Sequence, residues 1–420
     1  MKIGLSKKKK IILVVLSCII VVLIGGWWFF SVRIYNDNFN KRFESYEPLV
    51  FRVEDFEGLQ RTRYEFPSNK GQLLTGYIYG TGIDPKGILV MAHGFGSGHN
   101  SYMDCANYFA QRGYCVFAYD ATGNDESEGD GVGGIPQGVI DLDHAISFVE
   151  KSGYFPDLPI VLFGHSWGAY SACSVLTYHP EIKAVIECSG CNHPSDLFEA
   201  GGKEQAGSLI YTMIPFIKLH ERIQFGQFAS DTAMDGFAKS GAAIMIVHSE
   251  DDSVVPIEYG YDLFYEEYAN DPRFVFIRLE NKGHSYVYDD MTYIDELNAG
   301  FVDWLKTLDY DYQAAEYRER FAADKAEYLN DHLDRARWCN KLDKELFDRF
   351  LAFYDDHIIL DTKTKGEFSV LNTAIKNRIV NYAGHAANLI SRRRLFRWRE
   401  SRRKALHMAT LIWSSRSWLS

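Results

Sequence analysis

The first feature of the chain is an apolar run near its N-terminus. Residues 11–30 contain no charged side chain and follow four consecutive lysines, Lys7 to Lys10. At about 1.5 Å per residue, a helix of this length crosses roughly 30 Å of hydrocarbon. Trp27 and Trp28 lie near its far end, and aromatic rings favour the boundary between hydrocarbon and water. The pattern predicts a transmembrane helix over residues 11–30.

From residue 61 to about residue 308, short apolar runs alternate with longer amphipathic stretches. The short runs have the length of strands, and several are apolar throughout, as is typical of central strands buried on both faces. We predict strands at 72–79, 87–92, 114–119, 159–163, 184–187, 242–247 and 273–279. The longer stretches have helical spacing, and we predict helices at 102–112, 137–150, 169–178, 257–268 and 286–305. The alternation predicts an α/β fold with a mostly parallel sheet flanked by helices.

The remaining segments depart from this alternation. Residues 31–60 have no strong period and are interpreted as a polar connector. Residues 191–240 place about fifty residues between two strands where a crossover needs about a dozen, which predicts a helical cap over the edge of the sheet. Residues 309–420 are interpreted as a helical C-terminal extension with a basic tail. Its apolar positions have the spacing of one buried helix face, as in Phe347, Phe350, Leu351 and Tyr354.

Charge is distributed unevenly along the chain. The net charge of the 420 residues is −11, yet residues 1–10 contain five lysines and no acid, and residues 391–420 contain nine basic side chains and one acid. The acidic middle argues against nucleic acid as a partner, because phosphate binding needs a clustered basic face. The lysines before the span predict that residues 1–10 are cytoplasmic and that everything after residue 30 lies outside the cytoplasm. We therefore expect a single-pass cell-membrane protein with a signal-anchor.

Alternatives remain for both ends. A cleaved secretory signal usually has an apolar core of about 7–15 residues and a small-residue cleavage site, whereas this run is longer and ends in bulky aromatics, which favours the anchor. A lipid on Cys18 is disfavoured because the residues after it stay apolar. The basic stretch over residues 392–404 fits an interfacial helix on anionic lipid, or a solvated tail without a partner.

The sequence Gly164-His165-Ser166-Trp167-Gly168 lies directly between a predicted apolar strand and a predicted helix. Five such letters occur by chance in loops, but the strand-to-helix context indicates a sharp turn that exposes the serine hydroxyl. The glycines leave room for the neighbouring backbone. Because the next helix directs its first amides at the turn, negative charge is favoured there. We predict that Ser166 is a nucleophile.

A serine nucleophile needs a base and a group that orients the base. The strand predicted at 242–247 is followed by the carboxylates Glu250, Asp251 and Asp252, and the strand predicted at 273–279 is followed by His284. The carboxyl ends of parallel strands meet at one edge of a sheet. An acid, a histidine and Ser166 are therefore expected to lie together.

An oxyanion intermediate also needs hydrogen-bond donors. The strand predicted at 87–92 is followed by a loop of small residues that includes Gly94 and Phe95, whose backbone can approach a substrate. We predict that the amides of Phe95 and Trp167 form the oxyanion hole. No Lys-Ser/Thr pair follows the glycines, so a P-loop for phosphate is excluded.

These motifs together resemble those of the α/β-hydrolases, and most closely the monoacylglycerol-lipase-like and serine-aminopeptidase-like serine hydrolases. The resemblance covers about residues 61–308 and rests on residues 93–96, 164–168, 248–256 and 283–284. It implies an α/β-hydrolase fold with Ser166 as nucleophile, His284 as general base and acid, and Asp252 rather than Asp251 as its partner. It also implies that residues 191–240 form a cap.

The chain departs from the resembling families after the strand predicted at 114–119. Those families usually have the pattern D-x-R-G-x-G-x-S, but here Thr122 stands in the arginine position and Asp125 in that of the second glycine. Because this turn normally supports the fold, we expect altered local geometry there rather than altered catalysis.

The expected function is a membrane-anchored serine hydrolase that cleaves a small or lipid-like ester through an acyl-enzyme. Gly94, Met213 and Phe216 are predicted to contact an apolar acyl group. No cofactor is expected, and no metal, because the histidines without a role above lack paired ligand spacing: His99, His179, His193 and His220.

Two other functions remain open. A serine aminopeptidase would need acids for the substrate amine, and Glu199, Glu204 and Glu221 of the cap are candidates. A tethered binding protein that keeps the hydrolase shell without turnover is disfavoured, because all three predicted catalytic side chains and the oxyanion loop are retained. The sequence makes no prediction of the oligomeric state.

Overall fold

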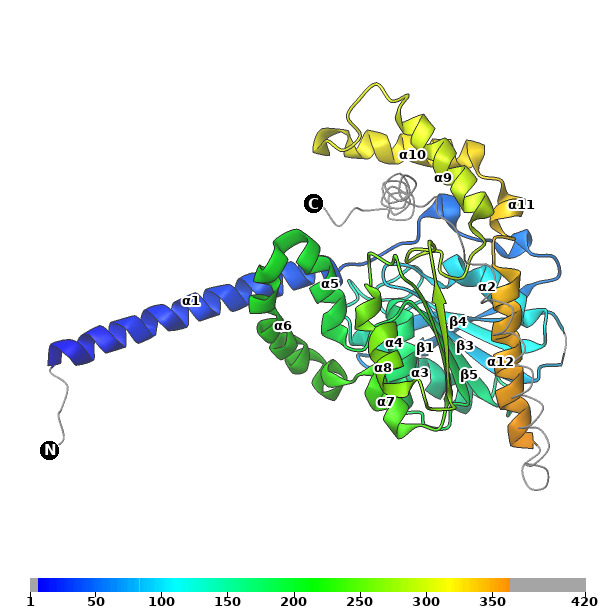
Figure 1. Cartoon of the computed structure of the whole chain (residues 1–420), viewed down its shortest axis with the longest axis horizontal. Helices are drawn as coiled ribbons and strands as arrows, with labels where there is room; N and C mark the ends of the chain where they lie inside the picture. Colours follow the sequence, from blue (N-terminus) through cyan, green and yellow to red (C-terminus); the bar gives the residue numbers. More distant parts are fainter. Residues whose placement is uncertain (1–6, 83, 363–420) are drawn as a thin grey trace, which may run out of the picture.

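The structure is a computed structural model that describes residues 7–82 and 84–362. Its centre is an eight-stranded sheet with the strand order β1-β2-β4-β3-β5-β6-β7-β8 (Figure 1). β1 and β2 pair antiparallel, β2 pairs antiparallel with β4, and every other neighbouring pair is parallel. The strands are β1 Gln60–Pro67, β2 Leu73–Gly80, β3 Gly87–Ala92, β4 Tyr114–Tyr119, β5 Ile160–His165, β6 Ala184–Cys188, β7 Ala243–Ser249 and β8 Phe274–Leu279.

Strands β2 to β8 lie where the sequence predicts them, and the α/β fold with a mostly parallel sheet is confirmed. The central strands β3 and β6 are buried along their whole length, which explains their continuous apolar runs. β1 was not predicted. It is an edge strand whose side chains are mostly exposed, so it lacks the apolar run by which the others were found.

Helices cover both faces of the sheet. α2 and α12 pack on one face, and α3, α4 and α8 pack on the other. The helices of the predicted α/β alternation are α2 Met103–Ala110, α3 Gln137–Lys151, α4 Trp167–Ser174, α8 Tyr261–Tyr268 and α9 Met291–Leu305. Each lies within its predicted range apart from one or two end residues, and α9 begins five residues later than predicted.

The segment between β6 and β7 folds into three helices, α5 Pro194–Ala206, α6 Ile210–Phe225 and α7 Ala233–Lys239. Thr232 begins α7 with a capping box, since its hydroxyl accepts from the amide of Asp235 at 3.0 Å. In Figure 1, α5 and α6 lie at one side of the sheet, next to the end of α1. This helical insertion occupies the place that the sequence assigns to a cap.

The N-terminal helix α1 spans Lys7–Phe39 and extends nine residues beyond the predicted span. Its apolar residues from Ile11 to Ile24 are largely exposed, whereas Ser31, Tyr35 and Phe39, four residues apart on one face, are buried. That buried face explains why the helix continues into the segment interpreted as a connector. α1 is the one helix in the described residues that is long and apolar enough to cross a membrane. This is compatible with an anchor or a signal sequence.

The C-terminal helices are α10 Arg318–His332, α11 Arg335–Trp338 and α12 Lys344–Thr362. Phe347, Phe350 and Tyr354 of α12 are fully buried, as their spacing predicts, and the hydroxyl of Tyr354 donates to the carbonyl of Leu162 at 2.6 Å. Figure 1 shows α12 running along the sheet.

A buried ion cluster also ties this region to the rest of the fold. The Lys341 ammonium lies 2.9 Å from carboxylate oxygens of both Asp104 and Asp289. The basic stretch 392–404 lies outside the described residues.

Candidate active site

Ser166 stands between β5 and α4 in a strained backbone conformation, with φ 56° and ψ −119°. Both flanking glycines are sterically required. A Cβ on Gly164 would lie 2.3 Å from the carbonyl oxygen of Gly168, and one on Gly168 would lie 2.1 Å from that of Ala92. The amide of Ser166 donates to the carbonyl of Cys188 at 2.8 Å, which holds the turn against β6. The turn therefore has the nucleophile-elbow geometry that its sequence predicts.

The structure brings Ser166, His284 and Asp252 together. Nε2 of His284 lies 2.8 Å from Oγ of Ser166, and its Nδ1 lies 2.7 Å from Oδ2 of Asp252. Because a carboxylate can only accept, Nδ1 carries the proton, and Nε2 accepts the proton of the serine hydroxyl. The three side chains thus form one directed hydrogen-bond chain.

Asp252 is buried and accepts hydrogen bonds on both oxygens. Oδ1 accepts from the amides of Val254 and Val255, each at 2.9 Å. Oδ2 faces Nε2 of His248 at 3.2 Å as well as His284. Burial raises the pKa of Asp252, but His284 and His248 outweigh it and hold the pKa well below its usual value. Asp252 is therefore an anion in this setting.

Asp251, the neighbouring carboxylate, has different hydrogen-bond partners. Its Oδ1 accepts from the hydroxyl of Ser249 at 2.5 Å and from the amide of Gly283 at 3.2 Å. These contacts attach the end of β7 to the loop that carries His284. The geometry thus separates the two adjacent acids, which the residue pattern alone did not.

His248 was not singled out by the sequence. Its Nε2 lies 2.9 Å from the carbonyl of Val255, so this nitrogen carries a proton and also faces Asp252. Burial lowers the pKa of His248, but the hydrogen bond and charge of Asp252 raise it overall. His248 opens the motif that supplied Asp252, and this position is the signal by which it is identifiable.

The predicted oxyanion residues lie together. The rings of Phe95 and Trp167 are in edge contact, with centroids 5.2 Å apart. Within the described residues, neither backbone amide donates to a protein acceptor, which leaves both free for a ligand oxygen. Gly94 precedes Phe95, and a Cβ there would lie 2.8 Å from the hydroxyl of Tyr102. The loop therefore approaches its neighbours too closely for a side chain at Gly94.

A second hydrogen-bond chain, which was not predicted from the sequence, joins His284, His165 and Tyr102. Nε2 of His165 donates to the carbonyl of His284 at 3.0 Å, so its Nδ1 is an acceptor and receives the hydroxyl proton of Tyr102 at 2.8 Å. The same hydroxyl accepts from the amide of Gly94 at 3.0 Å. Burial, reinforced by the neighbouring His284, lowers the pKa of His165 to about 3, which keeps this ring neutral. Tyr102 carries no sequence signal, because its role depends on contacts far along the chain.

The residues that were predicted to act in the cap lie in different surroundings. Met213 is buried in the apolar cluster that also contains residues of α1 and α5, and Phe216 is half-buried on the same helix. Glu199 accepts from Tyr259 at 3.0 Å. Glu221 accepts from Tyr35 of α1, and burial raises its pKa to about 7. The side chain of Glu204 lies outside the described residues.

One group of side chains has metal-ligand types close together: Glu150, His179 and Glu181. Both ring nitrogens of His179 are engaged, because Nε2 lies 2.8 Å from Asp143 and Nδ1 lies 2.9 Å from Glu181. Burial lowers the pKa of His179, but these carboxylates raise it overall. Both ring nitrogens of His179 therefore already have carboxylate partners in this structure.

Part of the chain is similar to a known protein family. Residues 83–235 match the family described as serine aminopeptidase, S33. Monoglyceride lipase of Rattus norvegicus is 33% identical over 94 residues, which are 22% of this chain and 30% of the lipase. That of Mus musculus is 31% identical over 98 residues, 23% and 32% of the two chains. The chain thus spans about a third of the length of these relatives.

Solved structures were also compared. An esterase of Pyrococcus furiosus superposes with a TM-score of 0.47 at 14% identity, over 64% of this chain and 97% of the esterase. The fold, the order of the motifs and the match over residues 83–235 agree with one another. The chain has the α/β-hydrolase fold and resembles the monoglyceride-lipase-like and serine-aminopeptidase-like hydrolases.

Proposed function

We propose that the chain is a membrane-anchored serine hydrolase that cleaves carboxylic esters through an acyl-enzyme. The observation that carries the proposal is the directed hydrogen-bond chain from Ser166 through His284 to Asp252. A serine hydroxyl is a weak nucleophile, and a neutral imidazole fixed by a buried carboxylate is the partner that activates it.

The reaction has two halves. In the first, Oγ of Ser166 attacks the ester carbonyl while Nε2 of His284 takes the hydroxyl proton, and the amides of Phe95 and Trp167 bind the resulting oxyanion. His284 then returns that proton to the departing alcohol, which leaves the acyl group on Ser166. In the second half, His284 takes a proton from water, the hydroxide attacks the acyl carbonyl, and His284 reprotonates Oγ as the acid is released.

An apolar acyl group is the favoured substrate. The cap helix α6 is rich in apolar side chains, including Met213 and Phe216, and the lipases that this chain resembles are named for a glyceride. α1 would hold the hydrolase at the membrane, with residues 1–10 in the cytoplasm and the hydrolase domain on the other side. Such a position would keep the enzyme near lipid esters.

Peptide cleavage is the second candidate, because the matching family is described as a serine aminopeptidase. Such an enzyme binds a free substrate amine, for which an unengaged acid would be needed. Of the three candidate acids, Glu199 is hydrogen-bonded to Tyr259 and Glu221 to Tyr35, which favours the ester over the peptide, and the side chain of Glu204 lies outside the described residues.

A substrate panel tests the choice. The full-length protein in detergent would be assayed against p-nitrophenyl esters of increasing acyl length and against aminoacyl p-nitroanilides, with Ser166→Ala as the blank. We expect ester hydrolysis that increases with acyl length and is absent in the variant. Faster turnover of the anilides would support the peptidase, and a folded wild type inactive on both series would support a binding protein.

A further inference from the structure

The end of helix α1 is packed beside the candidate active site. Tyr35 and Phe39 are buried, and the ring of Phe39 lies 5.4 Å from that of Phe95 and 6.1 Å from that of Phe198 in the cap helix α5. The amide of Ile135 donates to the hydroxyl of Tyr35 at 3.0 Å. In Figure 1, α1 reaches the body of the protein next to α5 and α6. The last turns of α1 thus lie between the cap and the loop that carries Phe95.

The chain then continues as a strap, which we define as residues 40–46. The strap pairs with the turn after β4 as a parallel bridge between Phe43 and Asn124. The amide of Phe43 donates to the carbonyl of Gly123 at 2.9 Å, and the amide of Asp125 donates to the carbonyl of Phe43 at 3.0 Å. Backbone hydrogen bonds in both directions fix the register of the strap on this turn.

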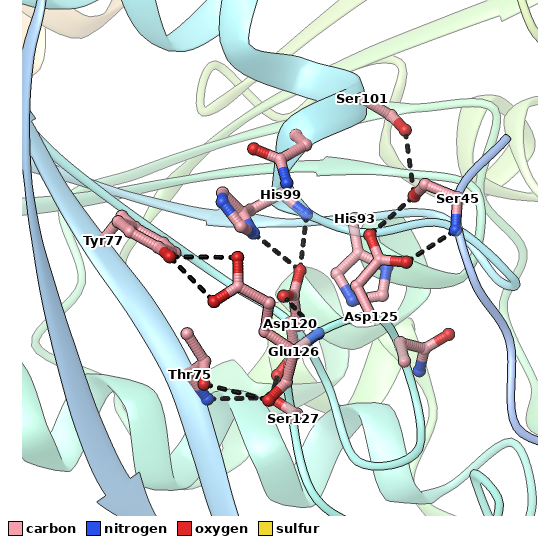
Figure 2. Close-up of polar contacts among 12 residues, drawn as sticks. Ser45, Thr75, Tyr77, His93, His99, Ser101, Asp120, Asp125, Glu126 and Ser127 are labelled. Atoms are coloured by element: carbon pink, nitrogen blue, oxygen red, sulfur yellow. Dashed lines mark hydrogen bonds and ion pairs between the residues drawn. The ribbon is translucent and has the colours of Figure 1, made fainter. Parts of the chain in front are cut away.

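Asp125 holds the next residue of the strap. Its carboxylate accepts from both the amide and the hydroxyl of Ser45, at 2.6 and 2.7 Å, as Figure 2 shows. Asp125 has φ 37°, a conformation that favours glycine, and the resembling families have glycine at this place. Keeping an aspartate there despite the strain is accounted for by its two hydrogen bonds to the strap.

An arginine of the strap also binds the turn. Thr122, which stands in the arginine position of those families, instead donates its hydroxyl proton to Asp141 at 3.0 Å and accepts from Gln72 at 2.9 Å. The Arg42 guanidinium donates to the carbonyls of Ser127 at 2.8 Å and Gly129 at 3.0 Å, and also to that of Asp125. The strap therefore binds the turn both through the Asp125 side chain and through three backbone carbonyls.

Aromatic contacts continue from this segment to the predicted oxyanion residues. The ring of Phe43 lies edge-on to that of Phe95 at 5.0 Å, and Phe95 lies edge-on to Trp167 at 5.2 Å. A Cβ on Gly96 would lie 3.2 Å from Phe43, so the ring also packs on the loop backbone. The partly buried ring of Phe95 thus contacts the rings of Phe39, Phe43 and Trp167.

The loop has a separate attachment at its other end. Nδ1 of His93 donates to the carbonyl of Gly94 at 2.8 Å, and its Nε2 accepts from the amide of Ala121 at 2.9 Å. Together with Tyr102, these bonds fix the loop up to Gly94. Beyond that point the amide of Ser97 donates to the carbonyl of Gly94 at 3.3 Å, which closes a turn around Phe95 and Gly96, and the packing of the Phe95 side chain adds to this restraint.

We propose that Phe39 and Phe43 are positioning residues that hold the Phe95 amide in place. The end of α1 and the strap would then both contribute to the hydrolase site. This inference rests on the proposed function. It implies that α1 and the strap are structurally coupled to the oxyanion hole and do more than attach the hydrolase domain to the membrane.

The test compares Phe39→Ala and Phe43→Ala with Phe29→Ala in the full chain, purified in detergent and assayed on a short p-nitrophenyl ester. Phe29 makes the matched control, because it is on the same helix and 73% exposed. Removing an oxyanion donor outright lowers kcat by about 100- to 1,000-fold, so a displaced donor is expected to lower kcat by about tenfold or more. KM should stay within about threefold in each variant, and Phe39→Leu, which keeps part of the packing volume, should lower kcat less than Phe39→Ala does.

The outcomes separate this inference from the proposed function. An inactive wild type would overturn both. An active wild type in which Phe39→Ala and Phe43→Ala keep the kcat of Phe29→Ala, even with a lower unfolding temperature, would overturn this inference alone. If the alanine variants do not fold, Phe39→Leu and Phe43→Leu give the same comparison, with an intermediate fall in kcat expected and no fall contradicting the inference.

Discussion

The hydroxyl of Tyr102 lies 2.8 Å from Nδ1 of His165 and receives the amide proton of Gly94 at 3.0 Å. Through His165 this one hydroxyl is linked to the carbonyl of His284. The loop that carries the candidate oxyanion donor and the loop that carries the candidate base are therefore connected by hydrogen bonds through Tyr102 and His165.

Tyr102→Phe is expected to weaken this connection. The variant leaves the Gly94 amide and Nδ1 of His165 buried without partners, which costs about 1–3 kcal/mol of stability for each group. We expect a lower free energy of unfolding and a lower kcat, measured by denaturant titration and ester hydrolysis. Tyr154→Phe is the control, since Tyr154 is 60% exposed. Equal behaviour of the two variants would contradict the role assigned to Tyr102.

Stability at low pH should depend on Asp252. Its pKa is lower in the folded state than in the unfolded chain, so the stability it contributes is present above the unfolded value and is lost as pH falls through the folded value. Asp252→Asn cannot ionise. The difference in unfolding free energy between wild type and this variant should therefore be largest near neutral pH and should shrink as the pH falls below about 4. A pH-independent difference would be inconsistent with this assignment.

Glu221 should have the opposite effect, because burial raises its pKa to about 7. As the pH rises above about 4.5, the unfolded chain loses the proton that the folded protein still holds, so stability falls until the folded group ionises near pH 7. Glu221→Gln keeps an acceptor for Tyr35 and cannot ionise. We expect its unfolding temperature, relative to wild type, to rise across this window and then to level off. A constant difference between the two proteins would rule out a raised pKa.

Gly168→Ala tests the packing of the nucleophile turn. The added Cβ would lie 2.1 Å from the carbonyl oxygen of Ala92, so backbone must move, and overpacking of this kind costs typically about 1–3 kcal/mol or more. Gly201→Ala, where nothing lies within 4 Å, should be neutral or stabilising. Thermal unfolding and ester hydrolysis of both variants would be compared. A Gly168→Ala protein as stable and active as Gly201→Ala would refute this reading of the turn.

Membrane attachment is testable through α1. Leu16→Arg and Val21→Arg would each raise the free energy of membrane insertion by about 2.5–3.5 kcal/mol in the middle of a spanning helix. The variant with both substitutions should therefore be lost from membranes after alkaline extraction. The double alanine variant should stay, as should wild type. A wild-type chain that is released with a shortened N-terminus would instead identify the segment as a cleaved signal.

The sequence predicted most of the sheet and the nucleophile turn because these depend on local pattern. Buried strands such as β3 and β6 are continuous apolar runs, and the glycines around Ser166 are dictated by close backbone contacts. Asp252 and His284 followed from the rule that carboxyl ends of parallel strands share one edge, with the family pattern selecting Asp252 over Asp251.

What the sequence did not predict depends on contacts between distant segments. The exposed edge strand β1 has no apolar run, and α1 continues to Phe39 because a face of it meets the cap. Tyr102 acts through partners that sequence spacing does not reveal. His248 stands in the motif that supplied Asp252, but its contact with that carboxylate is visible only in the structure. Asp125 and Thr122 were recognised as departures from the family turn, but the contacts of Asp125 with Ser45 and of Thr122 with Asp141 are visible only in the structure.

Covalent labelling would show whether Ser166 is the nucleophile. The full-length protein would be treated with a fluorophosphonate, digested and mapped by mass spectrometry, beside Ser166→Ala and His284→Ala. We expect one adduct on Ser166, none in Ser166→Ala and strongly slowed labelling in His284→Ala. A folded wild type that stays unlabelled, or an adduct on another residue that persists in Ser166→Ala, would contradict this role of Ser166.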